Sequence, residues 1–286
     1  MITNILLPTL LATLTTVLGM AQPISWRPVY ELFEERTEFR VGALEVRLVQ
    51  LKEWNWELRL SLNGRRIHKV DGLTSPGAAH FGLFLLLGTS NPELIVHADT
   101  GGSSPYAVCW IYTTEPTPQL LYSSERYWPQ HTPCGDLEVA DLDGDGVYEI
   151  RHVVASFRGY EGGCNACSCS PCPEAIFRYD PAKKKYRPAN WEFPMNLKAR
   201  IEEHLRYLKG IDRTADVTGQ YYAGGWLNVA FEYLYAGEDQ DALQFLKGKL
   251  GAEGAEEERR AIVKNIGKER FYREIEKARR DAARRK

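Results

Sequence analysis

Residues 137–156 read LEVADLDGDGVYEIRHVVAS, and this stretch decides the fold that we expect. Leu137 and Val139 alternate with other residues before its acidic centre, and β-branched side chains are frequent over 150–154 behind it. Both flanks are typical of strands, and Gly144 and Gly146 let the backbone turn tightly between them. The stretch therefore predicts a strand, a tight acidic loop and a second strand.

The loop between these strands crowds together four carboxylates: Asp141, Asp143, Asp145 and Glu149. Carboxylates this close repel one another unless a cation neutralises them. Calcium suits the set, because it takes six to eight oxygen ligands in flexible geometry, whereas magnesium demands a near-ideal octahedron and keeps its waters. The loop predicts a calcium site, and an acidic turn without an ion is the alternative.

The spacing of the loop argues against an EF-hand. With Asp141 as position 1, positions 7 and 9 are Val147 and Glu149, and position 12 is His152. An EF-hand needs a bidentate Glu at position 12 and helices on both sides, whereas here both flanks are predicted strands.

The stretch 137–156 resembles the calcium loop of FG-GAP or VCBS repeats, which form the blades of propellers. The resemblance is specific over this stretch and looser over 80–190. It implies blade-like sheets and five metal ligands: Asp141, Asp143, Asp145, the carbonyl of Val147, and Glu149.

A weak internal repeat appears when the chain is shifted by about 56 residues against itself. PELIVHADTGG in the first copy matches YEIRHVVASFRG in the second, and Glu93 aligns with Glu149. Each copy reads as four short antiparallel strands, which is the make-up of a propeller blade. The ligand positions of the first copy are apolar or neutral, so only the second copy is expected to hold a metal; these positions are Leu85, Leu87 and Thr89.

The β region, from about residue 40 to 190, is too short for a closed propeller, which needs at least four blades of roughly 40 residues. Fewer than three units of the repeat length fit. We therefore expect an open or sandwich-like stack of blade-like sheets.

Alternating side chains near the start of the β region predict a hairpin. Asn63-Gly64, two residues that adopt positive φ readily, separates the alternating run from the segment 65–70. The apolar positions of this run form one expected strand face: Trp54, Trp56, Leu58, Leu60 and Leu62.

Helical spacing begins near residue 194. Apolar residues at that spacing predict a helix ending at Gly210, a second helix over 221–236, and a third with Asp239 as N-cap. The segment WLNVAFEYLYAGEDQDALQFL, which starts at Trp226, resembles one tetratricopeptide repeat. A generic helix pair is the alternative, because any such pair needs small and aromatic residues at these spacings.

The expected fold class is α+β. The N-terminal antiparallel β region would consist of blade-like sheets, as a partial propeller or sandwich, followed by an α-helical region. Residues 22–192 form the expected β-rich calcium-binding domain, and residues 193–286 form the helical region with a charged last helix.

Residues 1–21 contain no charged side chain and are mostly apolar. Small residues at Gly19 and Ala21 predict signal-peptide cleavage before Gln22, with an uncleaved anchor as the alternative. No later stretch approaches the length of about 20 apolar residues that spans a membrane. The expected location is periplasmic or extracellular.

Six cysteines in an exported chain favour disulfides. We expect one bridge between Cys109 and Cys134. The others lie in CNACSCSPC, where two local disulfides, a bound metal and a redox-active CxxC stay open; they are Cys164, Cys167, Cys169 and Cys172.

No serine-nucleophile elbow, phosphate-binding loop or paired metal histidines occur in the sequence. The favoured class is a non-enzymatic binding or scaffold protein with a protein or glycan partner and no nucleic acid. An envelope hydrolase with dispersed catalytic residues and a thiol–disulfide enzyme are the rivals. Core packing on strand faces is the expected role of most of seven aromatic residues, and stacking platforms for sugar or peptide are the alternative: Trp54, Trp56, Tyr106, Trp110, Tyr122, Tyr127 and Trp128.

Overall fold

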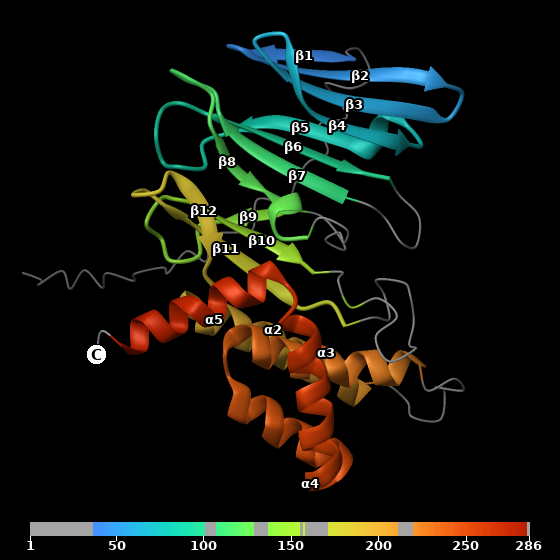
Figure 1. Cartoon of the computed structure of the whole chain (residues 1–286), viewed down its shortest axis with the longest axis vertical. Coiled ribbons are helices and arrows are strands. Elements are labelled where there is room, and N and C mark those ends of the chain that lie inside the picture. Colours follow the sequence, from blue (N-terminus) through green and yellow to red (C-terminus); the bar gives the residue numbers. More distant parts are fainter. Residues whose placement is uncertain are drawn as a thin grey trace, which may run out of the picture.

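The computed structural model describes residues 37–100, 107–128, 137–154, 157, 171–210 and 220–284. The expected leader, 1–21, lies outside these residues. In the part described, three four-stranded antiparallel sheets precede four α-helices, and no sheet closes into a barrel (Figure 1). The α+β class and the open stack of sheets are therefore confirmed.

The first sheet is a meander in which each strand pairs with the next along the chain. Asn63 (φ 51°) and Gly64 (φ 75°) close the turn between its last two strands, which confirms the predicted hairpin. Its strands are β1 Glu38–Val41, β2 Leu44–Lys52, β3 Asn55–Leu62 and β4 Arg65–Leu73.

Trp54 was expected on the buried face of a strand, and this expectation is wrong. Trp54 instead occupies the turn between β2 and β3, with φ 58° and 75 % of its surface exposed. Glu57, expected on the polar face, is 5 % exposed and pairs with Arg59 and with Lys69 at 3.3 Å. Irregular β3–β4 register near Trp56 accompanies this departure from simple alternation.

The second and third sheets repeat the four-strand meander, and in Figure 1 the three sheets lie one above the other. Three units fit where fewer than three were expected, because tight turns make the first sheet shorter than the repeat. The second sheet contains β5 Ala79–Phe84, β6 Glu93–Asp99, β7 Ala107–Thr113 and β8 Leu120–Ser123. The third contains β9 Glu138–Ala140, β10 Glu149–Val153, β11 Glu174–Asp180 and β12 Lys185–Pro188, and the 3₁₀ turns are η1 Pro76–Ala78, η2 Ser124–Arg126 and η4 Asn190–Glu192.

The second sheet is buried on both faces. Trp110 on β7 packs in a core cluster shared with the first sheet, and the next residue, Ile111, packs in a cluster shared with the third sheet. A strand covered on both faces needs apolar residues at every position, which explains the continuous run AVCWIY.

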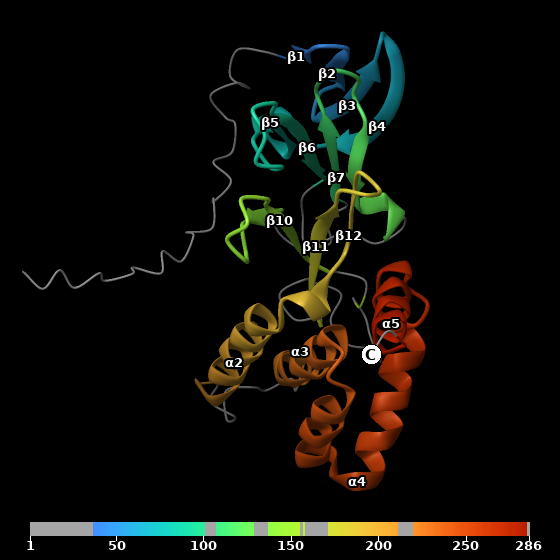
Figure 2. The ribbon, with the colours of Figure 1, turned by 90° about the vertical axis from the view of Figure 1, so that its left-hand side faces the viewer.

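The helices follow the third sheet and share its core. The cluster that holds Ile150 and Phe177 continues into three helices, through Phe231, Leu246 and Phe271. Figure 2 shows the helical region at the end of the sheet stack, against the third sheet. The helices are α2 Pro194–Gly210, α3 Gln220–Ala236, α4 Asp239–Ile266 and α5 Arg270–Ala283.

The predicted ends of α2 and α3, at Gly210 and Ala236, are confirmed. The N-cap of α4 is Glu238 rather than Asp239, and no side-chain cap bond forms there. Helix α4 is also interrupted at Gly251, where φ 78° and ψ 176° depart from helical values. Trp226 is half-buried and packs against the core from its edge.

The hairpin turn provides a direct test of backbone conformation. Gly64→Ala should cost about 1–2 kcal/mol of unfolding free energy, because an L-residue is strained at φ 75° although a Cβ has free space there. Gly248→Ala, exposed in the last helical turn before the interruption at Gly251 and with equally free space, should instead stabilise by up to about 1 kcal/mol. Urea denaturation of both variants is the measurement. A change in unfolding free energy of the same sign for both variants would contradict the positive φ assigned to Gly64.

Candidate metal centre

The acidic loop connects β9 to β10 and is organised by its first carboxylate. Asp141 accepts backbone N–H groups from Gly144 at 2.8 Å, Asp145 at 3.1 Å and Gly146 at 3.0 Å. Gly144 and Gly146 both have positive φ, which wraps the backbone around this side chain. The loop is therefore ordered by its own hydrogen bonds.

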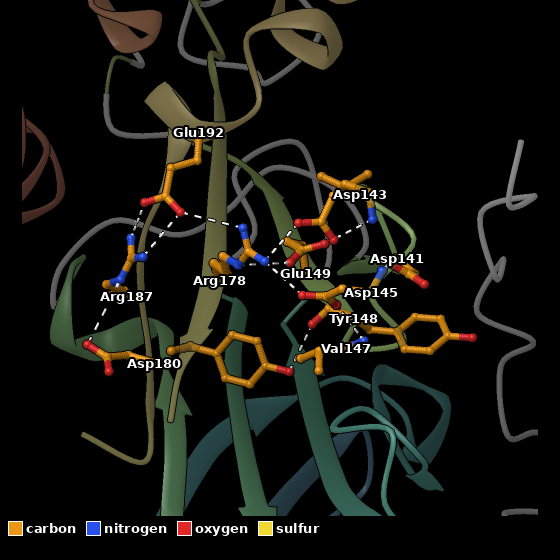
Figure 3. A network of polar contacts seen from close by, with 12 residues as sticks. Asp141, Asp143, Asp145, Val147, Tyr148, Glu149, Arg178, Asp180, Arg187 and Glu192 are labelled. Atoms are coloured by element: carbon orange, nitrogen blue, oxygen red, sulfur yellow. Dashed lines mark hydrogen bonds and ion pairs between the residues drawn. The ribbon is translucent and has the colours of Figure 1, made fainter. Parts of the chain in front are cut away.

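Three of the predicted ligands converge. Asp141, Asp143 and Glu149 each place one carboxylate oxygen within 4.8 Å of the others (Figure 3). This acidic triad could hold a metal ion. It brings a residue from the start of β10 together with two residues of the preceding loop.

Glu149 is the most constrained member of the triad. Its side chain is fully buried, Oε2 accepts the Leu142 N–H at 2.9 Å, and Oε1 accepts no hydrogen bond. Burial raises the pKa of Glu149 to about 7, with Asp143 and Asp145 adding to the rise and the Leu142 N–H and Arg178 opposing it. A buried carboxylate oxygen with no hydrogen-bond donor fits a cation, so the residues present are compatible with a metal ligand set.

Asp145 lies between the Val147 N–H and an arginine. Asp145 accepts the Val147 N–H at 2.8 Å through Oδ1, and its Oδ2 lies 2.7 Å from Arg178. Arg178 also lies 2.8 Å from Asp143 and 4.0 Å from Glu149 (Figure 3). Asp145 thus stands apart from the triad, turned to an arginine that sequence reasoning missed.

The first copy of the repeat contains the same local scaffold without the acidic loop. Glu93 Oε2 accepts the Leu86 N–H at 2.8 Å, which is the counterpart of the Glu149 bond to Leu142 at the same separation along the chain. The two loops also touch, because the Tyr148 N–H donates to the Leu86 carbonyl at 2.8 Å. The two copies therefore share this hydrogen bond as well as their strand pattern. Only the second copy has aspartates in its loop.

A second charged cluster, also missed in the sequence, joins α3 to β11. Strand β12 ends opposite Phe177, so the first half of β11 lacks a partner strand on that edge. Side chains take the place of the missing strand by accepting backbone N–H groups. Asn228 accepts the Cys172 N–H at 2.5 Å and Glu232 accepts the Glu174 N–H at 3.1 Å. Asn190 accepts the Ile176 N–H at 2.7 Å.

Glu232 is the charged centre of this edge. It is fully buried and pairs with Arg200 of α2 at 2.5 Å, while Arg200 also donates to the Cys172 carbonyl at 3.2 Å. Burial raises the pKa of Glu232 to about 7, the guanidinium of Arg200 opposes that rise, and Glu174 adds to it. These groups form hydrogen bonds with the backbone and link the helices to the sheet. The raised pKa of Glu232 therefore accompanies a structural role.

The seven aromatic residues considered as stacking platforms are mostly core, as packing on strand faces predicts. Trp110, Tyr122, Tyr127 and Trp128 are each no more than 3 % exposed, so core packing is confirmed for these four and the platform alternative is excluded. Trp110 and Tyr122 lie on the second sheet, which has a neighbour on each face, and Tyr127 and Trp128 pack against Phe177 and Phe271. Trp54 is exposed, Trp56 is half-buried, and Tyr106 lies outside the described residues.

A groove of about 280 Å³ lies between the edge strands β8 and β12. Tyr122, Arg126, Lys185 and Tyr186 contribute to its lining. Neither the acidic triad nor Glu232 borders it.

The cysteines divide between the core and segments outside the described residues. Cys109 is buried on β7, where burial raises the pKa of its thiol, and it forms no disulfide within the part of the chain described. Cys172 is also buried, beside the edge of β11. The bridge to Cys134 stays a prediction, and Cys164, Cys167 and Cys169 likewise lie outside the described residues.

Comparison with known proteins finds no matching family model, no similar curated protein and no similar solved structure. The FG-GAP/VCBS and tetratricopeptide resemblances therefore stay predictions. None of the helices in the described ranges is long and apolar enough to cross a bilayer.

Proposed function

We propose that this chain is an exported calcium-binding protein that acts as a non-enzymatic binding or scaffold module. The buried Oε1 of Glu149, which accepts no hydrogen bond and lies with Asp141 and Asp143, is the observation that carries the proposal. Asp145 and the Val147 carbonyl would complete the oxygen ligands. Calcium accommodates such a mixed set of carboxylate and carbonyl oxygens.

The ion would have a structural role at this position. The triad connects the loop to the first residue of β10, so a bound cation neutralises the crowded carboxylates and ties β9 to β10 through the loop. The third sheet in turn shares its core with α3, α4 and α5. Ion binding at this loop thus supports the element on which the helical region rests.

The partner is proposed from surface chemistry. Trp54 is held at the tip of a hairpin, 75 % exposed, with Leu51 also exposed nearby. An exposed aromatic ring of this kind stacks on a sugar ring or packs on a protein surface. A protein or glycan is therefore the proposed class of partner, in a periplasmic or extracellular location.

Calorimetric titration of the chelator-treated full chain tests the proposal. Calcium is expected to bind at one site per chain and magnesium more weakly, because magnesium gives up its waters reluctantly. Asp143→Asn should weaken calcium binding by lowering the ligand charge. The absence of calcium binding in wild type at millimolar ion would overturn the proposed function.

A further inference from the structure

We propose that Arg178 is an internal counter-cation of the acidic loop, which the metal ion displaces toward Glu192 at the start of the helical region. This inference rests on the proposed calcium function and extends it. It names Arg178 as the residue that limits calcium affinity. It also states how ion binding at the loop changes the ion pairs at the start of the helical region.

The first step is competition for the same oxygens. The Arg178 guanidinium lies 2.8 Å from Asp143 Oδ2 and 2.7 Å from Asp145 Oδ2, and it faces the buried Oε1 of Glu149 at 4.0 Å. A divalent cation on these carboxylates would use lone pairs that the guanidinium now occupies, and the two positive charges would repel at short range. Ion and arginine therefore compete.

Glu149 shows that the cluster is more than a set of surface acids. Its side chain is fully buried and its Oε1 points toward Arg178 and Asp143 without a hydrogen bond (Figure 3). The arginine satisfies Asp143 and Asp145 at close range and leaves the Glu149 oxygen at ion-pair distance only. The loop thus retains one buried carboxylate oxygen that a metal ion could approach more closely than the arginine does.

A displaced guanidinium has an alternative site within reach. Arg178 already lies 3.7 Å from Glu192 of η4 and 5.8 Å from the Phe193 ring, directly before α2 begins at Pro194. Arg187 pairs with the same Glu192 at 2.5 Å (Figure 3). Moving Arg178 toward Glu192 would replace its contacts with Asp143 and Asp145 by a closer contact with Glu192 and rearrange the ion pairs at the entry to the helices.

Trp191 provides a reporter of this movement. It precedes Glu192 in η4, and the Arg187 guanidinium lies 5.7 Å from its ring. A change in the ion pairs of Glu192 alters the charge next to this indole. Calcium should therefore change its fluorescence, although the ion itself binds at the loop.

The experiment compares calcium affinity in wild type, Arg178→Gln, Arg178→Lys and Arg187→Gln by calorimetric titration. Arg178→Gln is expected to bind calcium about tenfold more tightly, because one competing cation is removed. Arg178→Lys should lie between wild type and Arg178→Gln, because a lysine keeps the charge without the planar fork. Arg187→Gln tests the receiving site: it removes the other arginine from Glu192 and leaves the loop intact, so displacement of Arg178 becomes easier and the affinity should lie between those of wild type and Arg178→Gln.

Fluorescence supplies the second readout. Calcium should change wild-type emission, and the change should disappear in Trp191→Phe at unchanged affinity and in Arg178→Gln at higher affinity. Equal or weaker calcium binding by Arg178→Gln than by wild type, or a Trp191 signal that persists in Arg178→Gln, would overturn the inference while leaving the calcium function in place. Circular dichroism checks that each variant is folded. If Arg178→Gln does not fold, the calcium affinity of Arg178→Lys relative to wild type tests the inference instead. No binding by wild type or any variant would overturn the proposed function itself.

Discussion

Glu149→Gln is expected to remove most of the stabilisation that calcium confers on this protein. An ion that binds only the folded chain raises the free energy of unfolding by about 2.7 kcal/mol at 100-fold excess over its dissociation constant. The glutamine keeps an oxygen for the Leu142 N–H but carries no charge toward Asp141 and Asp143. Thermal unfolding in chelator, calcium and magnesium is the measurement.

The repeat supplies a matched control at Glu93. This glutamate is also buried and accepts the Leu86 N–H in the same manner, but its loop carries Leu85 and Leu87 where the second copy carries Asp141 and Asp143. Glu93→Gln keeps an oxygen for the same backbone N–H and should leave the calcium increment intact. Equal wild-type melting temperatures in chelator and in millimolar calcium would mean that the loop is only an acidic turn.

Glu232→Ala is expected to cost about 3–5 kcal/mol of unfolding free energy, because it breaks a buried ion pair by removing one partner. The Glu174 N–H would lose its acceptor, and the Arg200 guanidinium would lose its closest carboxylate. Since these contacts tie α3 and α2 to the edge of β11, the loss should also weaken the attachment of helices to sheet. Urea denaturation followed by circular dichroism measures the cost.

Glu202→Ala on α2 is the comparison for this variant, because Glu202 is exposed and its loss should change stability by no more than about 0.5 kcal/mol. A double-mutant cycle with Arg200→Ala isolates the pair, and a coupling energy near zero would contradict its assigned role. A Glu232→Ala cost close to that of Glu202→Ala would show that the β11 edge does not depend on α3.

Local patterns predicted several elements correctly. The Asn63-Gly64 turn and the end of α2 at Gly210 follow from backbone preference and residue period, which act over a few residues. The open stack of four-stranded sheets was expected from the internal repeat and the length of the β region. Trp54 shows the limit of such reasoning. Alternation placed it on a strand face, but the chain needed a turn at that point to pair β2 with β3.

The candidate site was predicted in part. Asp141, Asp143 and Glu149 are close in the chain, so a tight loop brings them together whatever surrounds it. Arg178 could not be assigned, because its place beside the loop depends on the register in which β11 pairs with β10, one position beyond the Ile150–Phe177 pair. Because a long segment separates the two strands, the sequence does not show in which register they pair.

By itself, the sequence determined the acidic loop, the strand and helix periods and the repeat of the four-strand unit, because each is encoded by neighbours within one turn or hairpin. Only the tertiary structure decided which faces are buried and which charges meet. Trp110 and Tyr122 became core because the second sheet is covered on both faces, and Glu232 became an edge partner because β12 is too short to cover β11. Such contacts depend on which distant segments pack together, and the period of one strand or helix does not specify its partners.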